Sequence, residues 1–311
     1  ARIVSSFVAV FAAALFVWKL MRSPRSRSAR GDAGPRLKTI LGFGLAQLGA
    51  TAGLSVTPWR MSVLLARSDP SLQQMGFYSV STQARVLLAI GPSMLGQIIY
   101  SSLTKEGSRP FGGPQRITRI ATYVNSIFVL AVLACFLPIV TTLIYIVYGA
   151  RYHGCEMAVT LSLATAVVQM CGVPAALRLS VISIATATTI NILWTGLAFL
   201  CACLFIPGQG AAGAAAAWLI AYTCSQLLVA VCLWRRGEYS RELIVLSCVA
   251  SVVAIAVSVF SYFQQLHPEL AVPLLLASAI VPAAAAAIMF RNSGLGGSLR
   301  ISRLLHAERT A

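Results

Sequence analysis

The sequence LKTILGFGLAQLGATAGLSVTPWRMSVLLARSDPSLQQMGFYSVSTQARVLLAIGPSMLGQIIYSSLT, residues 37–104, contains two long apolar segments. The short polar break SDPSLQQ, residues 68–74, joins them. Each segment is long enough to cross a bilayer, which takes about 20 apolar residues. Each also carries an arginine within its apolar part, Arg60 in the first and Arg85 in the second.

These two arginines are the candidate binding residues. A charge at mid-membrane costs about 2.5–3.5 kcal/mol on insertion scales, so it usually faces a polar cavity or a partner. We therefore expect Arg60 and Arg85, with Gln83 near them, to line a cavity that receives an anion. The alternative for each arginine is snorkelling of the charged group toward the outer interface.

The composition predicts an all-α, polytopic membrane helix bundle. The 311 residues are 58% hydrophobic and only 10% charged, whereas soluble domains are about 25% charged. Apolar runs predict about nine transmembrane helices. Their approximate ranges are 3–20, 37–66, 76–103, 120–148, 155–177, 181–206, 211–233, 243–263 and 270–290.

The positions of the basic residues predict the topology. Most of the 24 Lys and Arg residues fall in alternate connections between the predicted helices and in the tail, starting with the basic run at 21–36. Cytoplasmic loops carry the excess of Lys and Arg, so these connections and the C-terminus are expected to be cytoplasmic. The Arg-Ser run in 21–36 fits a loop that touches anionic lipid better than a nucleic-acid arm.

Chemical groups for catalysis are sparse. The two Asp and six Glu all lie in connections or at the ends of predicted helices, and no nucleophile–base set stands out. No cysteine pair has CxxC spacing, so the eight cysteines are interpreted as packing residues and no metal or cofactor is expected. GQGAAG, residues 208–213, matches a dinucleotide fingerprint but lies between two apolar segments, where a tight helix–helix turn is the better interpretation. We expect no enzyme activity.

Three stretches in order resemble one family. Residues 63–80 (VLLARSDPSLQQMGFYSV) resemble a helix-turn-helix joint, 138–152 (PIVTTLIYIVYGARY) an outward-ending helix, and 204–222 (LFIPGQGAAGAAAAWLIAY) an Ile-Pro-x-x-Gly-x-x-Gly-Ala-Ala turn. The set is similar to the polysaccharide and O-antigen flippase branch of the multidrug/oligosaccharidyl-lipid/polysaccharide exporter superfamily.

The resemblance implies the C-terminal part of a two-lobe exporter. Residues 1–20 would be the last helix of a missing N-terminal lobe, 21–36 a basic cytoplasmic linker and 37–234 the second six-helix lobe. Residues 235–290 would form two additional transmembrane helices and 291–311 a basic cytoplasmic tail.

The resemblance also implies a function. Such proteins flip undecaprenyl-pyrophosphate-linked oligosaccharides across the bacterial inner membrane by alternating access. The chain departs from many relatives by carrying Arg60 where they have an acidic residue, which argues against cation coupling at this helix. A multidrug or cation exporter, a membrane glycan polymerase or ligase, and a structural membrane subunit are the alternatives.

Overall fold

The computed structural model describes residues 56–106, 113–238, 241–266, 277 and 280–288. The chain divides into two units, residues 1–48 and 49–311, and every described residue belongs to the second. The predicted helix 3–20, the linker 21–36, the tail 291–311 and the expected boundary at residue 36 lie outside the described residues.

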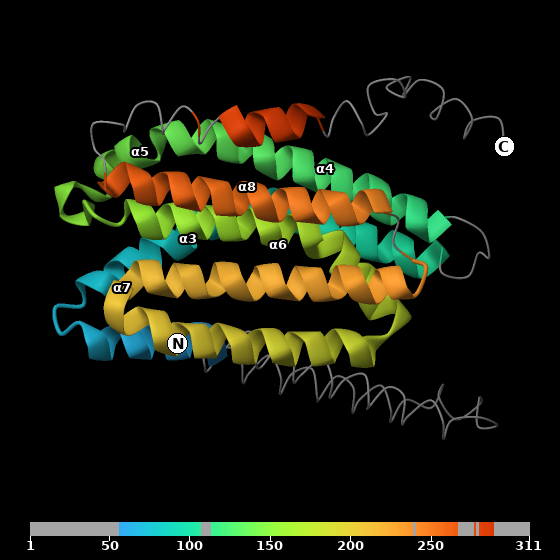
Figure 1. The fold of residues 1–311 in the computed structure, drawn as a ribbon, viewed down its shortest axis with the longest axis horizontal. Coiled ribbons are helices and arrows are strands. Elements are labelled where there is room, and N and C mark those ends of the chain that lie inside the picture. The colour runs from blue at the N-terminus through green and yellow to red at the C-terminus, as the bar shows by residue number, and fades with distance from the viewer. Residues whose placement is uncertain (1–55, 107–112, 239–240, 267–276, 278–279, 289–311) are drawn as a thin grey trace, which may run out of the picture. The chain divides into compact units, whose positions relative to one another are not determined.

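All regular elements among the described residues are helices, as predicted. Figure 1 colours them along the chain from blue to red. Residues 56–68 form the first, and residues 280–288 form the last. Between them lie α3 (Gln73–Glu106), α4 (Gly113–Phe136), η2 (Leu137–Ile139), α5 (Val140–Tyr148), η3 (Ala150–Tyr152), α6 (Glu156–Ile182), α7 (Ile184–Arg235) and α8 (Arg241–Leu266).

Three helical stretches are long and apolar enough to cross a membrane. They are Ile117–Ile139, Glu156–Ile182 and Ile184–Arg235. The all-α fold is therefore confirmed for the described part of the chain, which contains three apolar helices that could span a membrane. The count of nine transmembrane helices and the two-lobe arrangement stay predictions.

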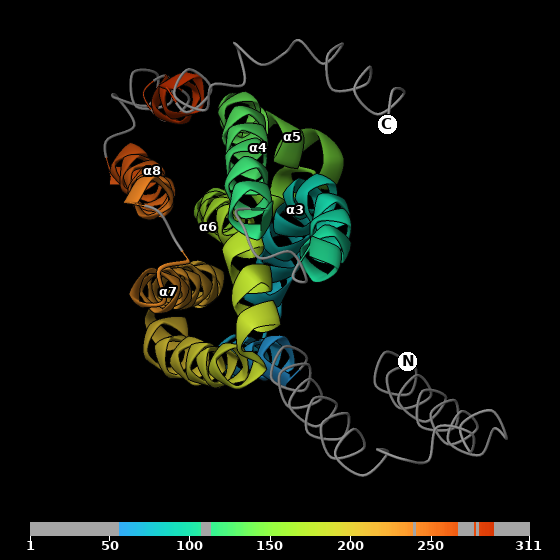
Figure 2. The ribbon, with the colours of Figure 1, turned by 90° about the vertical axis from the view of Figure 1, so that its right-hand side faces the viewer.

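Helix α6 lies at the centre of the described helices. It contacts α3, α4, α5, α7 and α8, and Figure 2 shows it between several of them in an end-on view. Its buried residues run continuously from Ala158 to Val168 instead of following one stripe. A helix that is apolar on all sides is stable only when neighbours cover every side, which explains this central place.

Helix α7 is a hairpin of two arms, residues 184–209 and 211–235. Gly210 has non-helical backbone angles (φ 54°, ψ −127°), a conformation that glycine adopts without steric cost. The arms then pack closely, because a side chain at Gly213 would collide with the backbone carbonyl of Phe205. The reversal falls in the expected turn, and Figure 1 shows the second arm returning beside the first.

The expected single helix at 120–148 is instead α4, η2 and α5. Pro138 stands at the start of η2, and proline lacks the N–H that an α-helix interior needs. The chain changes to a 3-10 turn over Leu137–Ile139 and then resumes as the nine-residue α5. A continuous apolar pattern concealed this break in the sequence.

The break expected at residues 178–180, between the predicted helices 155–177 and 181–206, lies inside a helix instead. Arg178 lies inside α6, only 8% exposed, and its Nη2 donates to Glu238 Oε2 at 2.8 Å. Glu238 follows the second arm of α7, so this carboxylate comes from 60 positions away in sequence. Helix α6 continues to Ile182, beyond the expected end at residue 177.

The turns with few basic residues meet at one end of the bundle. The backbone N–H of Ala211 donates to Gln74 Oε1 at 2.9 Å, which joins the turn after residue 68 to the α7 reversal. The centres of the Phe77 ring on α3 and the Tyr152 ring in η3 lie 6.0 Å apart, so the turn after α5 lies at the same end. The three turns with few basic residues therefore lie close together.

Candidate functional site

The polar break at residues 68–74 forms a compact turn around Asp69. The carboxylate accepts hydrogen bonds from the backbone N–H groups of Gln74 (2.9 Å) and Ser71 (3.0 Å) and from the Ser71 hydroxyl (2.6 Å). These bonds, that of the Gln74 N–H first, lower the pKa of Asp69 below its usual value because they favour the charged form. The turn places helix 56–68 beside α3, where the Tyr78 hydroxyl reaches Met61 Sδ at 3.7 Å.

Arg85 lies against the second arm of α7. Its guanidinium carbon is 5.0 Å from the centre of the Trp218 ring, a cation–π contact. Arg85 is partly exposed, while Trp218 is 3% exposed. The ring therefore forms a fixed apolar platform beneath a charged group that remains accessible.

Arg60 makes the equivalent contact with the first arm of α7. Its guanidinium carbon lies 5.2 Å from the centre of the Phe199 ring, and the side chain is exposed. The two candidate arginines, on different helices, thus both lie over aromatic rings of the α7 hairpin.

The two arginines lie at similar depths below the turn. Counting 1.5 Å per residue, Arg60 is about 12 Å from Ser68 and Arg85 is about 16 Å from Gln74 along the helix axes. A hydrocarbon core is about 30 Å thick, so both are near its middle if the turn lies at its edge. In the described part of the chain, neither guanidinium forms an ion pair or a hydrogen bond.

Four aromatic side chains pack together beneath Arg85. Trp194 lies 5.3 Å from Trp218 and 5.0 Å from Tyr222, ring centre to ring centre. The indole N–H of Trp218 donates to the Tyr78 hydroxyl at 3.0 Å. The cluster therefore holds the Arg85 platform rigidly between α3 and both arms of α7.

The cluster also contains an unpaired donor. The indole nitrogen of Trp194 is buried and has no hydrogen-bond partner among the described residues. An unpaired buried donor is unusual in a folded protein. Sequence reasoning missed Trp194, Phe199 and Trp218; the signal was the presence of large aromatics within the otherwise small-residue helices around the 207–213 turn.

Gln83 lies elsewhere than expected. Its Oε1 accepts a hydrogen bond of 2.7 Å from the Tyr148 hydroxyl at the end of α5. Residues two positions apart do not share a helix face, and Arg85 packs on α7 instead. The structure therefore brings Arg60 and Arg85 to one hairpin but directs Gln83 to another element.

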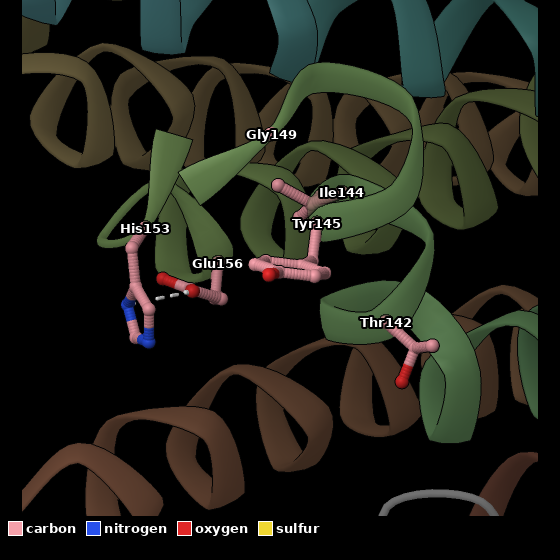
Figure 3. Close-up of a pocket in the computed structure, with 6 residues that line it drawn as sticks. All are labelled: Thr142, Ile144, Tyr145, Gly149, His153 and Glu156. Atoms are coloured by element: carbon pink, nitrogen blue, oxygen red, sulfur yellow. Dashed lines mark ion pairs between the residues drawn. The ribbon is translucent and has the colours of Figure 1, made fainter. Parts of the chain in front are cut away.

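A cavity of about 240 Å³ lies away from the arginines, at the end of the bundle where the turns meet. Thr142, Ile144, Tyr145, Gly149, His153 and Glu156 line it, as Figure 3 shows. His153 Nδ1 and Glu156 Oε1 are 3.3 Å apart at its rim. No group of three or more His, Cys, Asp or Glu side chains that could hold a metal ion occurs among the described residues.

Comparisons with known proteins add no relative: no protein-family model, curated protein or solved structure matches the chain significantly.

Proposed function

We propose that the chain is the C-terminal part of a transporter that flips undecaprenyl-pyrophosphate-linked oligosaccharides across the bacterial inner membrane, with its C-terminus in the cytoplasm. One observation carries the proposal. Arg60 and Arg85 lie at similar depths on neighbouring helices, each over an aromatic ring of α7. Neither has an acidic partner in the described residues.

The aromatic platforms suit an anionic substrate. A ring face attracts the guanidinium charge but takes none of its five N–H donors in a conventional hydrogen bond. Those donors remain for phosphate oxygens, which a guanidinium binds through two parallel hydrogen bonds. A carboxylate in place of the aromatic ring would accept these guanidinium hydrogen bonds and neutralise the positive charge.

The α7 hairpin and the 56–106 helix pair would then move the substrate. In the proposed mechanism, the pyrophosphate enters between the two arginines while the polyprenyl tail stays among membrane lipids. Rocking of this part against a preceding N-terminal lobe exposes the site to each side in turn, as in other transporters built from two repeats. An N-terminal lobe and the membrane lipids are the partners that this scheme requires.

A cation exporter of the same superfamily has less support. Such a protein needs a carboxylate within its spanning helices, facing the transport path. The described carboxylates whose surroundings are known, Asp69, Glu156 and Glu238, lie in a turn, at the start of α6 and after the end of α7.

Complementation of a flippase-deficient strain by the full-length protein tests the proposal. The double change Arg60→Gln and Arg85→Gln should abolish growth rescue while the protein remains in the membrane at normal amounts. Arg67→Gln removes the same charge near the end of the first helix, where the side chain is exposed, and should leave rescue intact. Full rescue by the double variant would remove both arginines from the mechanism.

A further inference from the structure

The cavity at the turn end of the bundle combines an aromatic ring with a carboxylate. Tyr145 on α5 is 63% exposed, and in Figure 3 its ring lies near Glu156, the first residue of α6. Thr142 adds a hydroxyl, while Ile144 and Gly149 complete the lining. These groups come from two helices and the turn between them, and the proposed transport mechanism uses none of them.

The carboxylate is held in place by the backbone. Glu156 Oε2 accepts a hydrogen bond of 2.7 Å from the backbone N–H of Gly154, which fixes the direction of the group. Among the described residues, its other oxygen pairs with His153 Nδ1 at 3.3 Å, and the side chain of His153 is 81% exposed and ion-pairs only when protonated. When His153 is neutral, the rim therefore has one negative charge that this histidine does not compensate.

An aromatic ring face beside a carboxylate is an arrangement that binds organic ammonium groups. The ring attracts the cation through its face, and the carboxylate accepts its N–H groups or faces its charge. Of the residues that the structure describes, no Lys or Arg lines the cavity; Arg151 belongs to the same turn, and its side chain is exposed. A carboxylate-bearing cavity without a lining cation disfavours an anion.

The size and surroundings indicate which ammonium. The cavity, about 240 Å³, is smaller than the roughly 300–1,000 Å³ of sites for drug-sized ligands, so it suits a headgroup. Ile146 and Val147 follow Tyr145 on α5 and are 74% and 60% exposed. Acyl chains would cover these apolar side chains next to the cavity.

We propose that this cavity binds the ammonium headgroup of a phosphatidylethanolamine-type lipid, with Glu156 and Tyr145 as its two recognition groups. The site goes beyond the proposed transport function and is independent of it. The lipid would be a bound structural or regulatory ligand at the membrane interface and not the transported molecule.

Native mass spectrometry of the full-length protein in detergent tests this site. Phosphatidylethanolamine and phosphatidylglycerol with identical acyl chains are titrated separately, with ethanolamine alone as the soluble arm. We expect the ethanolamine lipid to bind at least about tenfold more tightly than the glycerol lipid, as for a charge-assisted contact. Glu156→Gln, which keeps an acceptor for the Gly154 N–H, should remove this preference, and Tyr145→Leu should reduce it about two- to fivefold.

Asp69→Asn is the matched control, because it removes a carboxylate from another turn at the same end and should keep the preference. Equal binding of the two lipids to the wild-type protein would overturn the proposal, as would an unchanged preference in Glu156→Gln. Ethanolamine binding as tightly as the lipid would refute the lipid assignment. The Arg60→Gln/Arg85→Gln variant should keep the preference, so this site and the transport proposal fail separately.

Discussion

At the scale of single residues, one side chain determines how two distant turns meet. Gln74 accepts a hydrogen bond from the Ala211 backbone, directly after the reversal at Gly210. The positive φ of 54° at Gly210 disfavours any other residue, and a Cβ there would collide with the Gln74 side chain. The α7 reversal therefore depends on both a backbone conformation and a contact.

We predict that Gly210→Ala destabilises the protein by about 1–3 kcal/mol, the range for strain at a special backbone conformation. The measurement is unfolding of the purified full-length protein in mixed micelles with increasing denaturing detergent. Gly208→Ala is the control, because nothing lies within 4 Å of a Cβ at that position and its φ is not positive. Equal stability of the two variants would show that the reversal tolerates a side chain.

The second residue-scale prediction concerns pH. Hydrogen bonds lower the pKa of Asp69 in the folded protein below its usual value of 3.8. These hydrogen bonds therefore stabilise the fold when the pH is above 3.8 and the carboxylate is charged. This stabilisation is lost as the pH falls below that value and the carboxylate takes up a proton. Thermal midpoints between pH 7 and pH 3 should fall more for the wild type than for Asp69→Asn, and parallel curves would contradict the assignment.

The ring partners of the candidate arginines show what sequence reasoning could reach at this scale. A charge within an apolar segment is visible in the sequence, so the sequence alone identifies Arg60 and Arg85 as candidate binding residues. Phe199 and Trp218 could not be identified in this way, because they lie on the α7 hairpin and contact the arginines only in the folded chain. Gln83 was misplaced for the same reason, since its partner Tyr148 lies 65 positions away.

At the scale of elements, the lengths of the apolar segments predicted that helices form but predicted less well where each helix ends. The α7 reversal could be predicted because Pro207 and three nearby glycines mark it. Helix α6 extends past the expected end and carries Arg178 buried against Glu238, and such a long-range ion pair leaves no local signal in the sequence. The break before α5 does have a signal, Pro138, which the apolar run around it concealed.

We predict that Glu238→Gln destabilises the packing of α6 against α7. The change leaves the Arg178 charge buried without its carboxylate, and losing such a charged hydrogen bond costs about 1–3 kcal/mol. Arg235→Gln, which removes an exposed charge at the same end of α7, serves as the control. Equal unfolding curves for both variants would mean that the Arg178–Glu238 pair adds nothing to stability.

At the scale of the whole molecule, the separation of turns constrains topology. The turn at 68–74 contacts the α7 reversal. Two hydrogen bonds, Arg178 to Glu238 and Arg236 to Thr186, instead join the end of α7 to α6 and to the start of α7, where the connections carry basic residues. Single cysteines at Ser71 and Gln209, in a background without the eight native cysteines, should react with an impermeant maleimide added to intact cells. A cysteine at Gly237 should react only after the cells are opened, and labelling of all three in intact cells would contradict the predicted topology.

The central claim is that Arg60 and Arg85 together bind a pyrophosphate within the membrane. The most direct measurement is the affinity of undecaprenyl pyrophosphate for the full-length protein in nanodiscs, compared between the wild type, the Arg60→Gln/Arg85→Gln variant and Arg67→Gln. Since each guanidinium would contribute a charged hydrogen-bonded contact, we expect the double variant to bind at least about tenfold more weakly and Arg67→Gln to match the wild type. Wild-type affinity in the double variant would contradict the account.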